Sequence, residues 1–307
     1  MIDCARMHKA QPVSDVSAGS PRAFRGEGRG EHTEGWYEGM ASPRLLRSAL
    51  LSRLGVRHGF TTRRGGVSRG PFASLNLGES WGDEPAAVAA NLQHVADEAG
   101  FDPARLCQVR QVHGRDVLTL TAPERRQREA DGLATVSELA LGVMSADCVS
   151  LLLGDGEGRV AAAHAGWRGT VSDIAAEAVA ALVALGARPS SLRAAMAPSI
   201  GPCCFEVQAD VAAQFAAVVP DSVEPRGGRT YVNLWRTNRA LLLRAGLVPE
   251  HIELDPPCTC CDAERFYSYR RDGARRGGPG QAPGAPGWTP PGPLLGQHLA
   301  FICGGNS

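Results

Sequence analysis

The chain has 307 residues, 43% of them hydrophobic, and equal numbers of acidic and basic residues, so its formal net charge is zero. This length is enough to bury a sizeable core in one or two domains. The balanced charge excludes the strongly basic surface typical of nucleic-acid binding and gives no sign of attraction to an acidic membrane.

Lysine and cysteine usage narrows the chemistry further. Lys9 is the only lysine, which excludes a Walker-type phosphate loop and a Schiff-base lysine, so an anion site must use arginine or backbone N–H groups. The sequence has neither an apolar signal core nor an apolar run of the roughly 20 residues that span a membrane. We therefore expect a cytoplasmic protein, whose nine cysteines are thiols or metal ligands rather than a disulfide framework.

The first elements surround an arginine-rich loop. Residues 1–43 lack apolar periodicity, and we expect a disordered leader there, followed by a globular domain over residues 44–307. The segment TTRRGGVSRGPFASLNLG at 61–78 indicates a surface loop or, because Arg63 and Arg64 lie beside two glycines, an anion-binding loop.

Helical and strand signals follow along the chain. An amphipathic helix is predicted over Asp83–Gly100, with Asp83 as its N-cap and the glycine as its end. Residues 107–120 predict a strand, a turn at His113 and a second strand. Residues 170–186 predict one continuous helix, because small and apolar residues recur at helical spacing.

The stretch between these elements contains two short apolar runs, Val149–Leu153 and Val160–Ala163, joined by a glycine-rich turn. This pattern predicts a β-hairpin or two adjacent buried strands. If the two strands pair antiparallel, Cys148 before the first run and His164 after the second lie side by side at the open end. A thiol and an imidazole that meet there are either half of a metal site or a nucleophile–base pair.

The C-terminal part alternates helices and strands irregularly. We predict helices at about 206–218 and 233–246, a strand-like piece at 266–271 and a last strand at 299–303. Residues 273–297 are dense in glycine and proline, which indicates a flexible insertion. This irregular order favours an α+β sandwich with mixed sheets over a regular doubly wound sheet.

Three residues with ligand chemistry stand at predicted strand ends, namely His113, Cys148 and His164. Two imidazoles and a thiolate with an open fourth position are what a catalytic zinc needs. Their wide spacing requires the sheet to gather them. The residues alone therefore leave three alternatives open: a metal site, a cysteine nucleophile with a histidine base, or buried packing side chains.

The motifs of this chain resemble those of one known family. The segments TTRRGGVS, QVHG, ADGL, ADC, HAGWRG, SIGPCCFEV, CTCC and FYSYRRD occur in the order seen in the YfiH-like family. That family also carries the labels laccase-domain, multicopper polyphenol oxidase and peptidoglycan-editing factor. The resemblance runs from about His58 to Asp272 and includes the last strand, and HAGWRG together with ADC and QVHG is its most specific part.

The resemblance implies a fold, a metal and an activity. The fold is a single-domain α/β/β/α sandwich. The metal is zinc held by His113, Cys148 and His164, and copper could also bind to these donors in vitro. The activity is purine nucleoside phosphorolysis, in which adenosine, inosine or guanosine and phosphate give the free base and ribose 1-phosphate. Adenosine deamination and methylthioadenosine phosphorolysis are associated with the same family. The implied partners are a purine nucleoside and phosphate, and we expect a monomer.

The remaining candidate residues follow from this chemistry. Because the reaction passes through a ribosyl cation-like state, an anionic nucleophile must be held beneath the sugar. Asp131 or Asp147 either orients a metal-bound histidine or carries a proton, or it caps a turn. Trp167 stacks on a purine or packs in the core. The predicted catalytic residues are Cys148, His164, Asp147 and Asp131, and the predicted substrate-binding residues are Arg63, Asn76, Gln111, Trp167 and Arg168, with Arg63 and Arg168 as the phosphate ligands.

Other functions remain open. A cysteine hydrolase that edits peptidoglycan precursors would use Cys148 and His164 as nucleophile and base, Asp147 as the orienting group and N–H groups of residues 166–169 as an oxyanion hole. A copper-dependent polyphenol oxidase is disfavoured, because the eight histidines include no His-X-His pair. A non-enzymatic, zinc-stabilised binding module is the third alternative.

Five further cysteines gather in two motifs of the sequence. They are Cys203, Cys204, Cys258, Cys260 and Cys261. They form either a second, structural metal site or a set of buried thiols near the active site. The chain departs from the family pattern after FYSYRRD, where a Thr-Gly-Arg turn usually leads quickly to the last strand and where this sequence has its insertion at 273–297.

Overall fold

The computed structural model describes residues 36–38, 44–79, 82–253, 255–273 and 295–305. Most of the predicted leader 1–43 and of the predicted insertion 273–297 therefore lies outside the described residues. Within the described part, none of the helices combines the length and the apolar character that crossing a membrane requires.

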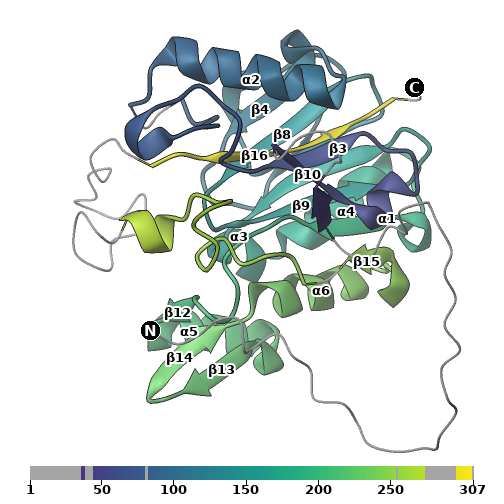
Figure 1. The fold of residues 1–307 in the computed structure, drawn as a ribbon. Coiled ribbons are helices and arrows are strands. Elements are labelled where there is room, and N and C mark those ends of the chain that lie inside the picture. The colour runs from purple at the N-terminus through teal and green to yellow at the C-terminus, as the bar shows by residue number, and fades with distance from the viewer. Residues whose placement is uncertain (1–35, 39–43, 80–81, 254, 274–294, 306–307) are drawn as a thin grey trace, which may run out of the picture.

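Two mixed β-sheets form the centre of the fold (Figure 1). The first has the strand order β1-β2-β3-β16-β8-β4-β6, with the bounds Trp36–Glu38, Leu45–Ser48, His58–Thr61, His298–Cys303, Ala140–Ser145, Leu106–Arg110 and Arg125–Glu129. The second has the order β15-β11-β9-β10-β7-β5, with the bounds Ile252–Glu253, Arg193–Met196, Val149–Gly154, Val160–Ala165, Gly132–Thr135 and Val117–Thr119. Each sheet combines parallel and antiparallel pairs: β4 runs parallel to β8 but β16 antiparallel to it, and β5 runs parallel to β7 but β10 antiparallel to it.

Helices cover the outer faces of both sheets (Figure 1). Helix α2 (Pro85–Ala99) lies over the first sheet, and α4 (Ile174–Ala184) and α6 (Leu234–Arg244) lie on the side of the second. The two sheets face each other and make contact through β8, β10 and β16. The result is an α/β/β/α sandwich with mixed sheets, which confirms the predicted fold class.

Smaller elements complete the described chain. A third sheet, β12-β14-β13 (Glu206–Val207, Arg229–Val232 and Val223–Arg226), packs with α5 (Ala209–Val218) at the bottom of Figure 1. Helices α1 (Ala49–Ser52) and α3 (Trp167–Val171) are short. Single 3₁₀ turns lie at Gly70–Phe72, Pro103–Arg105, Pro189–Ser191, Pro220–Ser222 and Pro249–His251, each with a proline in its first two positions, where the missing N–H costs nothing.

The strands between the two sheets supply most of the core. Strands β8, β9, β10 and β16 are buried along their whole length. Because both faces of these strands are covered, their sequences are continuous small or apolar runs rather than alternating ones. A leucine such as Leu152, buried between the sheets, stabilises the fold by about 1.5–3 kcal/mol.

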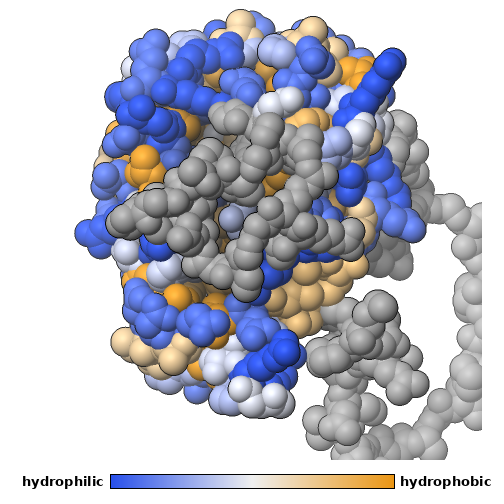
Figure 2. All heavy atoms as spheres, turned by 90° about the vertical axis from the view of Figure 1, so that its left-hand side faces the viewer, coloured by the Kyte–Doolittle hydropathy of each residue, from blue (hydrophilic) through white to orange (hydrophobic). Residues whose placement is uncertain are grey.

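The described surface is largely polar on one side of the molecule. Figure 2 turns the left-hand side of Figure 1 toward the viewer, and the visible described residues there are mostly hydrophilic, with small, separate hydrophobic patches. Among the described residues, the most exposed large hydrophobic side chains are four valines that are far apart in the sequence: Val67, Val112, Val136 and Val183.

The predicted N-cap at Asp83 is wrong by one residue. Helix α2 begins at Pro85, and Glu84 occupies the N-cap. The carboxylate of Asp83 instead accepts hydrogen bonds from the Asn76 side chain and from the Glu84 N–H, so it does not cap the helix. The predicted end is right, since Gly100 closes the helix in the left-handed conformation, with φ of 72°.

Two other helix predictions also need correction. The predicted helix 170–186 is divided between α3 and α4, because Asp173 takes a left-handed φ of 65° and its carboxylate caps the N–H of Ala176. Helix α5 begins at Ala209 rather than near 206, because the preceding residues form β12.

The predicted strand, turn and strand within 107–120 is confirmed, because β4 and β5 flank the loop of His113. Since β4 lies in the first sheet and β5 in the second, this loop crosses between the layers. The predicted strand-like piece at 266–271 is wrong, because the segment forms no strand and ends in a single π-helical turn, Tyr269–Gly273. The N–H of Arg270 donates to the Asp147 carboxylate at 2.6 Å instead of joining a sheet.

Candidate active site

The hairpin formed by β9 and β10 positions two of the predicted ligands. Its strands pair antiparallel from Gly154 opposite Val160 to Val149 opposite Ala165, as the sequence predicts. Cys148 immediately precedes β9 and His164 is the penultimate residue of β10, so both lie at the open end of the hairpin.

The third predicted ligand arrives from another part of the chain. His113 lies in the loop that crosses from the first sheet to the second, and it has a left-handed φ of 61°. Its imidazole ring and that of His164 have centroids 4.9 Å apart and meet edge to face at 82°. The donor atoms of His113, Cys148 and His164 all lie within 4.8 Å of one another. The fold therefore brings the predicted triple together.

Asp131 orients this cluster from beneath. Its buried carboxylate lies 2.8 Å from His164 Nδ1 and accepts the backbone N–H groups of Val112, His113 and Gly114 at 3.1, 3.0 and 2.6 Å. The bond to Nδ1 leaves His164 Nε2 for the centre of the cluster, and the other three fix the loop that carries His113. One carboxylate thus sets the position of two of the three donors.

The charges of the metal-free cluster favour a thiolate and an imidazolium. Burial raises the pKa of Cys148, but the charge of His164 and hydrogen bonds from both histidines outweigh it and lower that pKa to about 6. Burial likewise lowers the pKa of His164, yet the Cys148 thiolate and Asp131 raise it to about 10. Burial raises the pKa of Asp131, but the hydrogen bond and charge of His164 and the loop N–H groups more than offset this, so the pKa lies below its ordinary value.

We expect the lowered pKa to be visible in the alkylation of metal-stripped protein. Because the thiolate is the reactive form, iodoacetamide should modify Cys148 with a midpoint near pH 6, below the ordinary cysteine value of about 8.5. Mass spectrometry of the Cys148 peptide would report the rate, and Cys303, whose pKa burial raises to about 11, serves as the slow internal control. Added zinc should protect Cys148. A midpoint between pH 8 and 9 would contradict the predicted ion pair.

Two glycines of the HAGWRG motif permit this close packing. A Cβ atom at Gly166 would lie 3.2 Å from His113 Cδ2, 3.3 Å from Cys148 Sγ and 3.3 Å from His164 Cε1, so it would touch all three donor residues. A Cβ atom at Gly169 would lie 2.8 Å from the carbonyl oxygen of Gly114. The motif needs glycine at both positions because side chains would fill the space between the hairpin and the His113 loop.

Replacing Gly166 with alanine should weaken metal binding without unfolding the protein. The backbone at Gly166 has φ of −59° and ψ of 168°, which alanine adopts without strain, so only the added methyl group acts. Overpacking of about 1–3 kcal/mol corresponds to a roughly 5- to 150-fold loss of affinity, measurable by chelator competition. Gly154→Ala is the matched control in the same hairpin, because its Cβ would meet no atom closer than 3.5 Å. Equal effects of the two changes would contradict this explanation.

Asp147 contacts the segment next to the site and not the two histidines. It has an unusual left-handed φ of 94°, and its buried carboxylate accepts from Thr259 Oγ1 at 2.6 Å, Ser268 Oγ at 2.9 Å and the Arg270 N–H at 2.6 Å. Burial raises its pKa, although these hydrogen bonds act in the opposite direction. Asp131 is therefore the carboxylate that accepts the hydrogen bond of His164. Asp147, the residue before Cys148, instead joins the start of β9 to the segment 259–270.

Trp167 and Arg168 follow directly after Gly166. Both side chains are half-buried, and the Arg168 guanidinium lies 4.2 Å from the centre of the Trp167 indole. Among the described residues, the Arg168 side chain has no hydrogen bond or ion pair that would occupy it. A cation on a rigid aromatic support beside the donor cluster is well suited to hold an anion.

The contacts of Arg63 are structural. Its guanidinium donates to the carbonyl oxygens of Ala73 and Ala263 at 3.0 and 3.1 Å and lies 4.6 Å from the centre of the Tyr267 ring. These contacts join the arginine-rich loop to the segment around 263–267. Its predicted role in binding phosphate remains a prediction.

Asn76 and Gln111 also bind backbone groups. Asn76 Oδ1 accepts the N–H groups of Gly78 and Gln297, both at 2.8 Å. Gln111 pairs with both backbone groups of Met144, donating to its carbonyl oxygen at 2.9 Å and accepting its N–H at 2.7 Å. Gln111 thereby anchors the loop of His113 to β8. Binding of substrate by either residue remains a prediction.

The sequence did not predict the contacts of Arg270 and Arg271, the two arginines of FYSYRRD. The Arg271 guanidinium donates to the carbonyl oxygens of Thr259 and Phe266 at 2.9 and 2.7 Å, which holds the CTCC loop in place. Arg270 donates to the carbonyl oxygen of Cys204 and lies 5.5 Å from the centre of the Phe205 ring. The motif FYSYRRD was the available signal, but it does not show which carbonyl groups these side chains reach.

The three donors suit a transition-metal ion. Two neutral imidazoles and one thiolate match the ligand preference of zinc, and three protein ligands leave a position for water or substrate, as in catalytic rather than structural zinc sites. Copper prefers the same nitrogen and sulfur donors, so the donor set alone does not choose between the two metals.

Comparison with known proteins places these features in a family. The family model described as "Multi-copper polyphenol oxidoreductase laccase" matches residues 57–281. A protein of Deinococcus radiodurans named purine nucleoside phosphorylase is 44% identical over 235 residues, which cover 76% of this chain and 89% of that protein. A second relative with this name, from Streptomyces griseus, is 41% identical over 219 residues, covering 69% of this chain and 88% of that protein.

A solved structure shows the same architecture. The crystal structure of YlmD from Geobacillus stearothermophilus superposes with a TM-score of 0.76 at 30% identity, covering 89% of this chain and all of that chain (100%). The motifs, the sandwich fold and the family match agree, and the chain therefore belongs to the YfiH-like, laccase-domain family.

Proposed function

We propose that this chain is a zinc-dependent purine nucleoside phosphorylase. It would cleave the glycosidic bond of adenosine, inosine or guanosine with phosphate and release the base and ribose 1-phosphate. The observation that carries the proposal is the open three-donor site of His113, Cys148 and His164, supported by the buried carboxylate of Asp131. The relatives named purine nucleoside phosphorylase support the same activity.

The residues around the site divide the tasks of this reaction. His113, Cys148 and His164 would hold the zinc ion, which would supply a Lewis acid to the reaction. Asp131 accepts from His164 Nδ1 and so holds that imidazole in one tautomer and one orientation. Arg168 holds the phosphate, and Trp167 presents an aromatic surface on which a purine base stacks.

The Arg168 side chain gives a test of phosphate binding. Arg168→Gln should raise the KM for phosphate about 10- to 100-fold, because a charged hydrogen bond is worth about 1.5–3 kcal/mol, while the KM for the nucleoside changes little. Initial rates at varied phosphate concentration would measure this. Arg188→Gln, at an exposed arginine next to a 3₁₀ turn, is the control and should behave as the parent. An unchanged phosphate KM in Arg168→Gln would remove Arg168 from the site.

The donors in the described part do not favour a multicopper oxidase. Among those residues, the only other compact group of metal-type donors consists of cysteines. Two of the remaining histidines make structural hydrogen bonds. His58 Nε2 accepts the backbone N–H of Ser48 and His298 Nε2 that of Tyr267, both at 2.8 Å. The described part therefore lacks the second, histidine-rich centre that laccase chemistry requires.

A cysteine hydrolase is the second candidate, and one observation favours it. Cys148, His164 and Asp131 also have the order of a nucleophile, a base and an orienting carboxylate, and the pKa of Cys148 is lowered to about 6 in the absence of metal. That mechanism assigns no catalytic role to His113. His113→Ala should therefore abolish activity in the zinc enzyme and spare it in a cysteine hydrolase.

The proposed function is tested by the products formed from adenosine. The purified full chain is incubated with adenosine, with and without phosphate, and the products are separated by chromatography. We expect adenine and ribose 1-phosphate in equal amounts, only with phosphate, lost after chelation and restored by zinc. Inosine formed without phosphate would assign the site to deamination. Activity that survives both chelation and His113→Ala would favour the cysteine hydrolase.

A further inference from the structure

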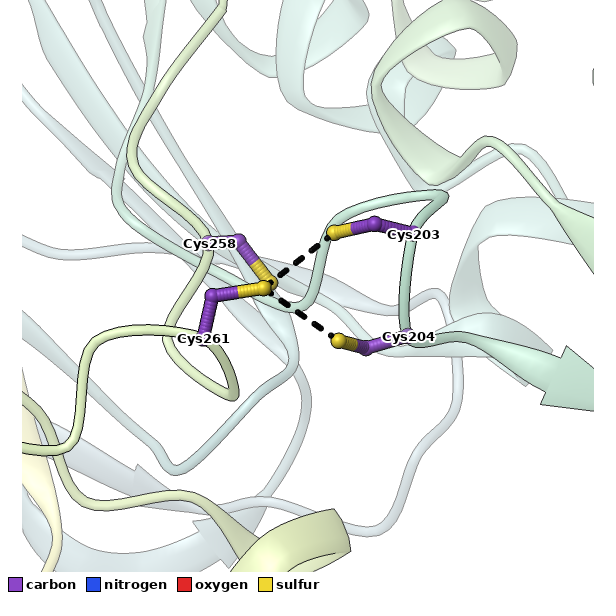
Figure 3. A group of neighbouring side chains, drawn as sticks. All are labelled: Cys203, Cys204, Cys258 and Cys261. Carbon is purple, nitrogen blue, oxygen red and sulfur yellow. Dashed lines mark hydrogen bonds between the residues drawn. The ribbon is translucent and has the colours of Figure 1, made fainter. Parts of the chain in front are cut away.

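A cluster of cysteines lies outside the candidate active site. Cys203 and Cys204 lie in the turn that follows β11, and Cys258 and Cys261 lie in the loop that follows β15. Their sulfur atoms all lie within 4.8 Å of one another, and Figure 3 shows the four side chains converging from the two loops. Cys261 is bonded in a disulfide, contrary to the thiol expected from the sequence, whereas Cys203, Cys204 and Cys258 are free thiols. The reactive sulfurs of this cluster are therefore the latter three.

Cys258 is held as the thiolate of the cluster. The N–H of Gly201 donates to Cys258 Sγ at 3.1 Å. Hydrogen bonds from the Cys203 and Cys204 thiols and from this N–H lower the pKa of Cys258 below its ordinary value, although burial acts in the opposite direction. Because the thiolate is the nucleophilic form of cysteine, Cys258 is the sulfur of this cluster best prepared to attack an electrophile.

Cys203 stands next to this thiolate. A Cβ atom at Gly201 would lie 3.2 Å from both Cys203 Sγ and Cys258 Cβ, so the two side chains meet across a glycine that leaves space between them. The backbones of the two segments are already joined here, because Ser199 forms a β-bridge with Cys258 and accepts the Thr259 N–H at 3.0 Å. A disulfide between Cys203 and Cys258 therefore requires rotation of the side chains and no large movement of the backbone.

We propose that Cys258 and Cys203 are a peroxide-sensitive pair, which hydrogen peroxide oxidises to a disulfide. The Cys258 thiolate attacks one oxygen of the peroxide, the O–O bond breaks, and the departing hydroxide takes up a proton to become water. The Cys203 sulfur then attacks the sulfur of the Cys258 sulfenic acid, the S–O bond breaks, and the oxygen leaves as water with the Cys203 proton. The two electrons of each turnover come from the two sulfurs.

Burial of the thiolate selects a small oxidant. Cys258 is only 5% exposed, and Cys203 is half-buried. A mixed disulfide between Cys258 and a tripeptide such as glutathione needs much more room than the transfer of one oxygen atom. We therefore expect hydrogen peroxide, and not oxidised glutathione, to oxidise the pair.

The disulfide joins two segments that hold the residue next to Cys148. The Ile200 N–H, in the first segment, donates to the Asp147 carbonyl oxygen at 2.8 Å, and Thr259 Oγ1, in the second, donates to the Asp147 carboxylate at 2.6 Å. A covalent bond between the segments restricts the movement of both. Oxidation of the pair therefore stiffens the support of Asp147, which immediately precedes Cys148.

The proposal is tested by mapping the bond that peroxide forms. The full chain, as purified and without prior reduction, is treated with hydrogen peroxide, alkylated, digested with trypsin and analysed by mass spectrometry. We expect a new cross-link between the tryptic peptides 194–226 and 245–265, reversed by dithiothreitol and absent after treatment with oxidised glutathione. Activity is not measured, so the result does not depend on the proposed phosphorolysis.

Matched variants identify the two sulfurs. Cys258→Ser and Cys203→Ser should each abolish the cross-link, and Cys203→Ser should leave a Cys258 sulfenic acid that dimedone traps. Cys204→Ser, Cys260→Ser and Cys261→Ser change cysteines of the same two loops and should form the cross-link as the parent does. Circular dichroism shows whether each variant folds, and the half-buried Cys203 gives an independent test if Cys258→Ser does not. Absence of the cross-link in the parent, its persistence in Cys203→Ser, or its loss in Cys204→Ser, Cys260→Ser or Cys261→Ser would overturn the assignment.

Discussion

Replacing Cys148 with alanine is expected to lower the phosphate-dependent release of adenine at least about a thousandfold. Cys148 is the only sulfur donor of the three-donor site, and its loss leaves two imidazoles, too few to hold a catalytic zinc tightly. A Lewis acid contributes several kcal/mol to catalysis, and each 1.36 kcal/mol is about a factor of ten in rate. Steady-state rates and the zinc content of the purified protein would both fall.

A buried cysteine elsewhere provides the control for this change. Cys107 lies in β4 and its sulfur donates only to the carbonyl oxygen of Arg105, at 3.6 Å. Cys107→Ala should keep full zinc content and nearly full activity. A Cys148→Ala chain that retains more than about a tenth of the parent activity would show that the reaction does not depend on this thiol.

Asp131→Asn is expected to weaken metal binding about 10- to 100-fold and to lower the free energy of unfolding by about 1–3 kcal/mol. The carboxylate receives four hydrogen bonds, one from His164 and three from the loop that carries His113. An amide has only one oxygen, and its NH₂ group would face one of these donors. The buried site therefore loses acceptors without gaining a partner, and the orientation of both histidines loosens.

Chelator competition and thermal unfolding would measure the two effects of Asp131→Asn. The control is Asp116→Asn, because Asp116 is an exposed carboxylate close by in the sequence whose backbone, rather than its side chain, contacts the Asp131 segment. If both variants bound zinc with the parent affinity, Asp131 would be a turn cap and not the residue that orients the ligands.

The sequence was sufficient for the parts of the site that depend on local pattern. The two apolar runs around a glycine-rich turn predicted the β9–β10 hairpin, and antiparallel pairing then required Cys148 and His164 to meet. His113 stood out as a third ligand candidate at a predicted strand end, but no local pattern could place it beside the other two, because its loop crosses from one sheet to the other. The strength of these predictions comes from register, which fixes neighbours across a hairpin.

Long-range contacts could not be predicted from the sequence. Asp131 and Asp147 both precede or follow short turns and looked equivalent, yet one carboxylate reaches His164 and the other reaches Thr259 and Ser268. The helix break at Asp173 was hidden because its neighbours have good helical periodicity, and only the left-handed backbone reveals it. Likewise, the need for glycine at Gly166 is set by three side chains that come from different segments.

The most direct test of the account is the recovery of activity as zinc is returned to metal-free protein. The full chain is stripped of metal, zinc is added in steps, and adenine released from adenosine in the presence of phosphate is measured at each step. We predict no phosphate-dependent release without zinc, full recovery once the site of His113, Cys148 and His164 is filled, and no recovery in Cys148→Ala. Undiminished release from the metal-free chain, or recovery in Cys148→Ala, would contradict it.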